Sequence, residues 1–360
     1  MNLVVAYYPF RSEFNKYTEL SQSILKMNGC NIVDFEALVD GKIEKADIII
    51  LNWYESVYSR NPFKLIKKFQ AKINVLKSQK EKGAKIIFTF HNKKPHSLGL
   101  PFCLPVNDLI GKINIARMYR MADRIIILSK DSRKYLLYYL QKKDINKKAF
   151  YIPHPNYIDA YSHPLKENIY NYDGIFKILF IGAIRPYKNI ELILEAAKVL
   201  DIPSIRFYIK GAADKEYQEK IMRDARQCQN VEFAFKFIED TEIEETIRYS
   251  DILLIPYDVK SSMNSGTAIL AFSNGRSLIC PQISTIREID KDLVYTYDYK
   301  SKKEHIDRII FNIRQAYDDW LNNRSEFEAK GTKLYEYVKI TYSLDGLAKR
   351  YKLMFDELLK

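Results

Sequence analysis

The feature that most constrains the fold of this chain is an alternation of short runs rich in β-branched and aromatic residues with longer amphipathic stretches, which occurs in two consecutive series. Alternation of this kind is typical of βαβ units and predicts parallel sheets. The first series predicts strands at 3–8, 31–35, 47–51, 85–90, 124–128 and 149–153, and helices at 15–28, 62–82, 105–121 and 131–142. The second predicts strands at 177–182, 205–210, 231–235, 252–256, 277–281 and 293–297, and helices at 189–200, 214–227, 241–249, 266–274, 303–321 and 343–359. We therefore expect an α/β protein with two parallel-sheet domains.

The length of the chain supports the same division, because 360 residues exceed what one hydrophobic core usually organises. The two series are separated by HPNYIDAYSHPLKENIYNYDG, a polar segment rich in proline and tyrosine that we interpret as a linker. We expect a first domain at 1–165, a second at 170–340, and a last helix, about 343–360, that packs back on the first domain. Two such domains facing one another would bind ligands in a cleft at the carboxyl ends of their strands.

Composition and cysteine usage exclude several classes of protein. The chain is 47% hydrophobic and 28% charged, which is ordinary for a globular protein and unlike disordered or fibrous chains. Its four cysteines are far apart and form no C-x-x-C pair, so we expect reduced, structural thiols and no metal site. The apolar run in the opening MNLVVAYYPFRSEF is too short for a signal peptide. No apolar run in the sequence reaches the about 18 residues that a membrane-spanning helix needs. These observations predict a cytoplasmic protein.

The net charge of +12 is concentrated in the first half of the chain. Residues 1–166 hold 28 Lys+Arg and 14 Asp+Glu, or +14, whereas the remainder holds 29 and 31, or −2. The densest segment starts at Arg60 and ends at Lys94, with eleven basic residues and one acid, Glu81. Its helix, 62–82, either packs an apolar face on the sheet in an ordinary way or rests its lysines on anionic lipid headgroups. The second interpretation places the protein peripherally on the inner face of the membrane.

The same charge, together with abundant tyrosine, raises nucleic-acid binding as another hypothesis. That function needs aromatic side chains interleaved with basic ones on a single surface. Many aromatics instead fall inside strand patterns, where core packing explains them, as at Tyr7, Phe88, Phe180 and Phe207. We therefore expect no nucleic-acid partner.

The segment KILFIGAIRPYKNIELILEAAKVL is the most informative motif. A buried strand ends at Gly182, a helix starts near Asn189, and Arg185 and Lys188 lie in the turn between them. Such a turn suits a diphosphate, because glycine permits a tight turn, backbone N–H groups point out of the helix start, and two cations can reach the same oxygens. The alternative is a solvated loop whose basic residues bind nothing.

A second segment, YSDILLIPYDVKSSMNSGTAILAFSNGRSLICPQISTIREI, follows about seventy residues later. Asn264, Ser265, Gly266 and Thr267 would open a helix there, and would present hydroxyls and N–H groups to an anion. The next strand is followed by a loop that reaches Glu288. Taken alone the segment is weak, since serine and threonine cap many helices that bind nothing.

Together these segments, over 177–290, resemble the donor-binding domain of GT-B glycosyltransferases, especially family 4 (glycosyl transferases group 1). The matching positions are Gly182, Arg185, Lys188, the stretch from Asp251 to Pro256, Ser265 with Gly266, Asn274 with Gly275, and Arg287 with Glu288. The resemblance implies two Rossmann-like domains facing across a cleft. It also implies that Arg185 and Lys188 grip the donor diphosphate, and that the segment from Asn264 to Thr267 and Glu288 contact the donor.

The chain departs from the family at several of its functional positions. Leu270 and Ser262 stand where the family has a pair of glutamates, and Ala183 stands where its arginine usually is. The resemblance implies a metal-independent transferase of the hexosyltransferase type, without a cofactor. It would move a sugar from a nucleoside-diphosphate donor, UDP-sugar before GDP-sugar, to a hydroxyl of a glycan or lipid-linked saccharide in cell-surface polysaccharide synthesis. The missing glutamates leave open a second hypothesis, a GT-B partner subunit without catalysis.

In the first half, KIIFTFHNKKPH ends a predicted strand at His91. A histidine at a strand end could contact the donor sugar or act as a base toward the acceptor hydroxyl. Family relatives also place a histidine after this strand, so His91 is the catalytic candidate. The alternative is a loop histidine bonded to a backbone carbonyl.

Overall fold

The structure is a computed structural model that describes residues 2–12, 15–93, 105–161 and 172–360. Its contacts divide the chain into two compact units. The first contains the residues up to Pro155 together with Tyr342–Lys360, and the second is Asn156–Thr341. Lys94, His96 and Cys103 lie outside the described residues.

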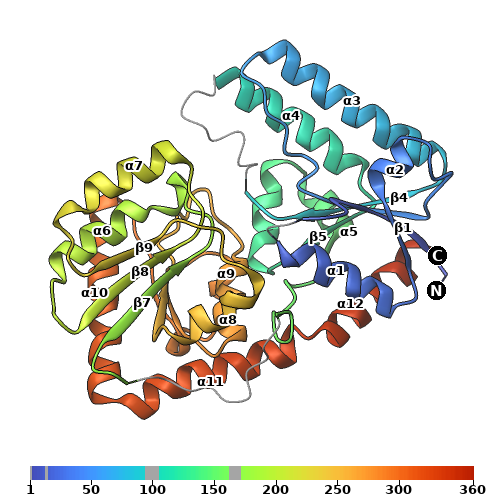
Figure 1. Cartoon of the computed structure of the whole chain (residues 1–360). Coiled ribbons are helices and arrows are strands. Elements are labelled where there is room, and N and C mark those ends of the chain that lie inside the picture. The colour runs from blue at the N-terminus through green and yellow to red at the C-terminus, as the bar shows by residue number, and fades with distance from the viewer. Residues whose placement is uncertain (1, 13–14, 94–104, 162–171) are drawn as a thin grey trace. The chain divides into compact units, whose positions relative to one another are not determined.

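The first unit contains a six-stranded sheet in which every pairing is parallel (Figure 1). Its strands are β1 (Val4–Tyr8), β2 (Asn31–Asp34), β3 (Ile48–Asn52), β4 (Lys85–Phe90), β5 (Arg124–Ile127) and β6 (Ala149–Tyr151), in the order β2-β1-β3-β4-β5-β6. All of β3 is buried, as expected for a strand covered on both faces. The six strands predicted for this half are confirmed, with ends that differ by a residue or two.

Helices cover both faces of this sheet. They are α1 (Lys16–Met27), α2 (Phe35–Val39), α3 (Pro62–Glu81), α4 (Pro105–Met121), α5 (Lys142–Lys148) and α12 (Leu344–Leu358), with a 3-10 helix at Asp131–Tyr138. The single helix predicted at 131–142 is therefore wrong. Gln141 has extended backbone (ψ 153°), which separates the 3-10 helix from α5.

Helix α12 returns from the end of the chain to complete the core of the first unit. Leu347, Tyr351 and Phe355 pack with α1 and with one face of the sheet, and the Asn28 side chain donates a hydrogen bond to the Ala348 carbonyl (2.8 Å). The residues just after Pro155 belong to the other unit. The Asn156 side chain donates to the Val338 carbonyl (3.0 Å), and the Tyr157 N–H donates to Ser273 Oγ (2.9 Å). These bonds explain why the division falls after Pro155; the predicted boundary at 165–170 lies outside the described residues.

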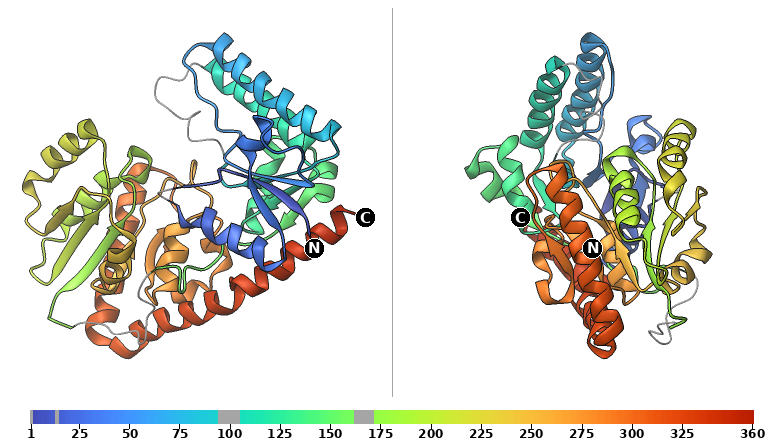
Figure 2. Two further views of the ribbon diagram at one scale, coloured as in Figure 1. Left: turned by 45° about the vertical axis from the view of Figure 1, so that its right-hand side comes forward. Right: turned by 90° about the vertical axis from the view of Figure 1, so that its left-hand side faces the viewer.

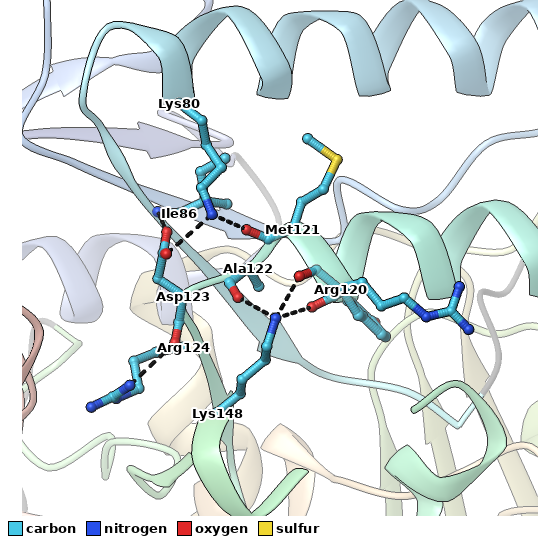
Figure 3. Close-up of polar contacts among 9 residues, drawn as sticks. Lys80, Ile86, Arg120, Met121, Ala122, Asp123, Arg124 and Lys148 are labelled. Atoms are coloured by element: carbon cyan, nitrogen blue, oxygen red, sulfur yellow. Dashed lines mark hydrogen bonds and ion pairs between the residues drawn. The ribbon is translucent and has the colours of Figure 1, made fainter. Parts of the chain in front are cut away.

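Two lysines donate hydrogen bonds to backbone carbonyls near the amino ends of β4 and β5 (Figure 3). Lys148 Nζ donates to the carbonyls of Arg120 and Ala122 at the end of α4. Asp123 accepts from Lys80 Nζ (3.1 Å) and from the backbone N–H of Ile86 (2.8 Å). Lys80 and Lys148 thus satisfy carbonyls at a helix end, where cations are stabilised by the helix dipole.

The second unit contains another fully parallel six-stranded sheet. Its strands are β7 (Phe176–Ile181), β8 (Ile205–Lys210), β9 (Val231–Ala234), β10 (Ile252–Leu254), β11 (Leu278–Pro281) and β12 (Tyr295–Tyr297), in the order β12-β11-β10-β7-β8-β9. The chain moves outward from β7 to β9 and then returns to place β10 on the other side of β7. The carboxyl ends of β7 and β10 therefore form a topological switch point, where open parallel sheets bind ligands.

The helices of the second unit are α6 (Ile190–Val199), α7 (Lys215–Asp224), α8 (Asp240–Arg248), α9 (Gly266–Ser273), α10 (Lys302–Asn322) and α11 (Arg324–Thr341). Helix α11 was not predicted from the sequence. Its pattern was nevertheless present, because Phe327, Gly331, Leu334 and Val338 are buried at helical spacing.

Candidate functional site

Two glycines shape the switch point of the second unit. Gly182 follows β7 with φ +121°, and Gly211 follows β8 with φ +152°. Residues with a Cβ rarely adopt these backbone conformations. Their backbones are in contact, since a Cβ on Gly211 would lie 1.9 Å from the Gly182 carbonyl oxygen. A Cβ on Gly182 would be 3.9 Å from Thr267 Oγ1 of α9. At the end of β7, the Gly182 backbone thus has no side chain to cover it and lies beside the start of α9.

The start of α9 is held in place by serine and threonine. Ser265 is the N-cap, and its hydroxyl accepts from the Ala268 N–H (3.1 Å). The Ser265 N–H donates in turn to Thr285 Oγ1 (3.1 Å). The predicted segment from Asn264 to Thr267 therefore does open a helix, whose first N–H groups and dipole favour an anion. Its role in donor binding stays a prediction.

Lys188 reaches the same place from the turn after β7. Its Nζ contacts the Tyr257 hydroxyl and lies 3.8 Å from the centroid of the Tyr257 ring. The Tyr257 hydroxyl donates to Thr267 Oγ1 (3.3 Å). Asn189, in the left-handed region at φ +54°, donates to the Pro256 carbonyl (2.8 Å) and ties the turn to the end of β10. Lys188, Tyr257 and Thr267 form a polar chain beside Gly182.

Arg185, the other basic residue of this turn, pairs with an acidic side chain. Its guanidinium forms an exposed ion pair with Asp214 (3.0 Å), which caps α7. Of the two cations expected to converge on one diphosphate, Lys188 contacts the Tyr257 hydroxyl and Arg185 pairs outward with Asp214.

Glu288 and the two positions of the missing glutamates lie near α9 in the chain and belong to the same unit. Glu288 is half-buried, and its backbone carbonyl accepts from the Tyr337 hydroxyl (3.4 Å) of α11. Ser262 is buried, and its N–H donates to the Asp258 carbonyl (2.8 Å). Leu270 is half-buried on α9. Neither side chain can replace a carboxylate.

The loop between β10 and α9 is braced by residues that the sequence analysis did not single out. Tyr299 accepts from the Val259 N–H (3.0 Å), and His305 stacks on its ring at 3.8 Å with 8° between the planes. Burial lowers the pKa of His305 to about 4, so this ring is neutral near pH 7 and serves as a flat packing surface.

His91, in the first unit, follows β4 and is buried, at 6% exposed. Its Nε2 lies 3.0 Å from Asn52 Oδ1, and its ring stacks on Trp53 at 4.0 Å. Because Asn52 Nδ2 donates to the Tyr8 carbonyl (3.0 Å), its Oδ1 faces the histidine and accepts. The Asn52 amide oxygen is thus one hydrogen-bond partner of the His91 ring, through Nε2.

A buried carboxyl group in the same unit was also missed. Glu55 follows β3 and is 3% exposed, and burial raises the pKa of its carboxyl to about 7.

Lys72 of α3 donates to the Tyr54 carbonyl (2.5 Å) and lies 4.1 Å from the centroid of the Tyr54 ring. Burial lowers the pKa of Lys72 to about 8. This lysine of the basic segment therefore points into the unit, away from any anionic surface.

Two further properties hold for the described residues. Nowhere among them do three histidine, cysteine, aspartate or glutamate side chains gather closely enough to hold a metal ion. In the same parts of the chain, every helix is too short or too polar to cross a lipid bilayer.

The two parallel-sheet units, with a glycine-ended strand and a capped helix at the switch point of the second, define a GT-B fold. Solved structures agree. A sucrose-phosphate synthase from Thermosynechococcus elongatus has a TM-score of 0.75 at 12% identity, over 100% of this chain and 99% of that one. HepE of Anabaena, solved in complex with UDP and glucose, has a TM-score of 0.67 at 10% identity, over 99% and 100%.

At the sequence level, residues 165–333 match the family described as "Glycosyl transferases group 1". A curated GDP-mannose:glycolipid 4-beta-D-mannosyltransferase from Xanthomonas campestris pv. campestris is 22% identical over 145 residues. That match covers 39% of this chain and 41% of the relative's length. This chain is thus a divergent GT-B protein that resembles the group 1 glycosyl transferases.

Proposed function

We propose that this protein is a glycosyltransferase that moves a sugar from a nucleoside-diphosphate donor to a hydroxyl of a glycan or lipid-linked saccharide. The observation that carries the proposal is the polar chain of Lys188, Tyr257 and Thr267 beside Gly182, at the switch point of the unit that matches the group 1 family. The donor is a substrate, and the proposal includes no cofactor.

In this proposal the second unit stabilises the departing diphosphate. Lys188 Nζ and the first N–H groups of α9 supply positive charge where negative charge develops as the glycosidic bond to the diphosphate breaks. The open backbone at Gly182 allows the diphosphate to approach β7 closely. Arg185 would exchange Asp214 for a phosphate oxygen, and Glu288 would contact the donor as the family resemblance implies.

His91 is the proposed catalytic residue of the first unit. Its imidazole can accept the acceptor hydroxyl's proton or orient the attacking group, while the contact with Asn52 holds the ring. The hydroxyl oxygen then forms the new bond to the anomeric carbon as the diphosphate leaves.

Relatives and neighbours suggest which donors and acceptors to test. HepE was solved with UDP and glucose, and TarM of S. aureus with UDP, whereas the curated relative is named for GDP-mannose and a glycolipid. We propose a UDP-sugar as the first donor and GDP-mannose as the second. A lipid-linked acceptor would place the protein in the cytoplasm, at the inner face of the membrane, with the basic segment that starts at Arg60 toward the anionic surface.

Replacing Lys188 with alanine tests the proposal. Loss of one charge-stabilising donor typically costs about 10²–10³-fold in turnover, so Lys188→Ala should lose at least about 100-fold in donor turnover with its melting temperature retained. Lys198→Ala, an exposed lysine on α6, is the matched control and should retain wild-type turnover. Unchanged kinetics in Lys188→Ala would refute the assignment.

A partner subunit without catalysis is the second candidate, because Leu270 and Ser262 occupy the positions of the family's glutamates. A panel of uridine, guanosine and adenosine diphosphate sugars separates the two. Turnover of any donor by the purified chain supports the enzyme, and binding of a nucleotide without turnover of any supports the subunit.

A further inference from the structure

A stripe of exposed apolar side chains runs along α3 and α4 of the first unit. Phe63 is 77% exposed and Ile66 45% on α3, while Leu109 is 57% and Ile113 51% exposed on α4. Val106, at 46%, begins the same stripe. Large apolar side chains grouped in this way mark interaction surfaces, whereas single ones are ordinary.

The two helices bring these residues together because they are parallel neighbours (Figures 1 and 2). Near their starts, Asn107 of α4 donates to the Ser59 carbonyl (3.2 Å) just before α3. At their ends, Lys80 donates to the Met121 carbonyl (2.7 Å). Between these points Arg117 of α4 reaches Gln70 of α3 (3.5 Å).

Helical spacing then places the apolar residues on one seam. One turn before Gln70 and Arg117 stand Ile66 and Ile113. One further turn back stand Phe63 and Leu109. We call these four residues, with Val106, the α3–α4 seam.

The fold does not use the seam for its own core. The buried apolar residues of α3 are Leu65, Phe69, Ile73 and Leu76, which recur at helical spacing on a different face. The apolar face that α3 buries therefore does not include Phe63 and Ile66. Phe63 and Ile66 remain exposed although α3 already buries another apolar face.

The charges around the seam are nearly all positive. Arg60, Lys64 and Lys67 are exposed beside its α3 side. On the α4 side, Lys112 Nζ lies 4.0 Å from the centroid of the Tyr138 ring, and Tyr138 is itself 41% exposed. The nearest acid in α4, Asp108, is half-buried. An apolar centre with a cationic rim fits a surface that is anionic outside and apolar beneath.

We infer that the α3–α4 seam inserts into the headgroup and upper acyl region of an anionic lipid bilayer. The lysines and Arg60 pair with lipid phosphates, and the seam residues occupy the interface beneath them. A second copy of the chain is a poorer occupant, because a symmetric contact would bring the two cationic rims together. The inference stands on exposure and charge and does not depend on the transfer reaction.

Vesicle flotation of the full chain tests the inference. The probes are vesicles of phosphatidylcholine alone and of phosphatidylcholine mixed with phosphatidylglycerol. The seam variant combines Phe63→Ser, Leu109→Ser and Ile113→Ser. The control variant combines Ile340→Ser, Phe311→Ser and Leu353→Ser, which remove side chains of matching exposure (74%, 59% and 53%) elsewhere on the chain.

The wild-type chain should float with the mixed vesicles and much less with phosphatidylcholine alone. The seam variant should bind the mixed vesicles at least about ten-fold more weakly, since three apolar side chains no longer leave water. The control variant should behave as wild type. A Phe63→Trp variant should shift its emission to the blue with mixed vesicles, which reports insertion directly.

Several results would overturn the inference. They are equal flotation of the seam variant and wild type, no flotation of the wild type, an equal loss in the control variant, or no emission shift in Phe63→Trp. Self-association of the wild type that the seam variant loses would assign the seam to a second copy instead. Donor turnover without vesicles should be the same in the seam variant, so a failure of this inference and a failure of the proposed transfer remain distinguishable.

Discussion

The contact between Gly182 and Gly211 can be tested by adding a single carbon atom. In Gly211→Ala the new Cβ would lie 1.9 Å from the Gly182 carbonyl oxygen and 2.7 Å from its carbonyl carbon. The obstacle is backbone, so no side-chain rotation relieves it. Relief requires the end of β8 to move away from β7, although Ile181 and Lys210 are paired directly before the two glycines.

The expected cost has two parts. Alanine at φ +152° adds backbone strain of about 1–3 kcal/mol, and forcing a methyl group into a filled space adds about 1–3 kcal/mol. The sum, about 2–6 kcal/mol, corresponds to a fall in melting temperature of about 4–24 °C for a unit of this size. Because the shift occurs where Gly182 borders Thr267, donor affinity should fall as well.

Gly174→Ala is the matched control in the same unit. Its φ is +82° and a Cβ there would meet nothing within 4 Å, so it carries backbone strain without the clash. Thermal unfolding followed by circular dichroism should show a small fall for Gly174→Ala and a clearly larger one for Gly211→Ala. Equal falls in the two variants would mean that the glycine contact does not constrain the site.

Two further predictions concern buried polar groups. Burial raises the pKa of Glu55 from 4.5 to about 7, so the stability that its protonated form contributes is present below pH 4.5 and is lost as the pH rises through 7. Glu55→Gln should therefore gain up to about 3 kcal/mol over wild type at pH 8 and little at pH 4, and a gain independent of pH would contradict this. Tyr257→Phe keeps the ring beneath Lys188 but removes the hydroxyl between Lys188 and Thr267. We expect about a ten-fold higher KM for the donor at an unchanged melting temperature, with Tyr187→Phe as control; a lower melting temperature with the same KM would make Tyr257 structural.

The fold was largely predictable because its determinants are local. Each strand is a short apolar run next to a turn, and each helix carries its own periodicity, so all twelve predicted strands occur. The exceptions have local causes too. Extended backbone at Gln141 split one predicted helix, and α11 was missed although its buried residues recur at helical spacing.

The candidate site was predictable only in part. Gly182, Lys188 and Ser265 stand in motifs that a single segment displays, and the structure places them around the end of β7 and the start of α9. Tyr257 has no such motif, because its role arises from a contact with Lys188, 69 residues away in the chain. The same holds for Gly211 against Gly182.

By itself, the sequence determined the class of fold, two parallel-sheet units, and the glycine-ended strand that leads into a basic turn, because periodicity and glycine-ended strands are properties of neighbouring residues. Tertiary structure alone decided which side chains of those segments meet and which remain exposed. Arg185 pairs with Asp214, Lys72 points inward beside Tyr54, and Phe63 remains in solvent. Each outcome depends on which other element packs against that residue, and the spacing of residues along one helix or strand does not contain that information.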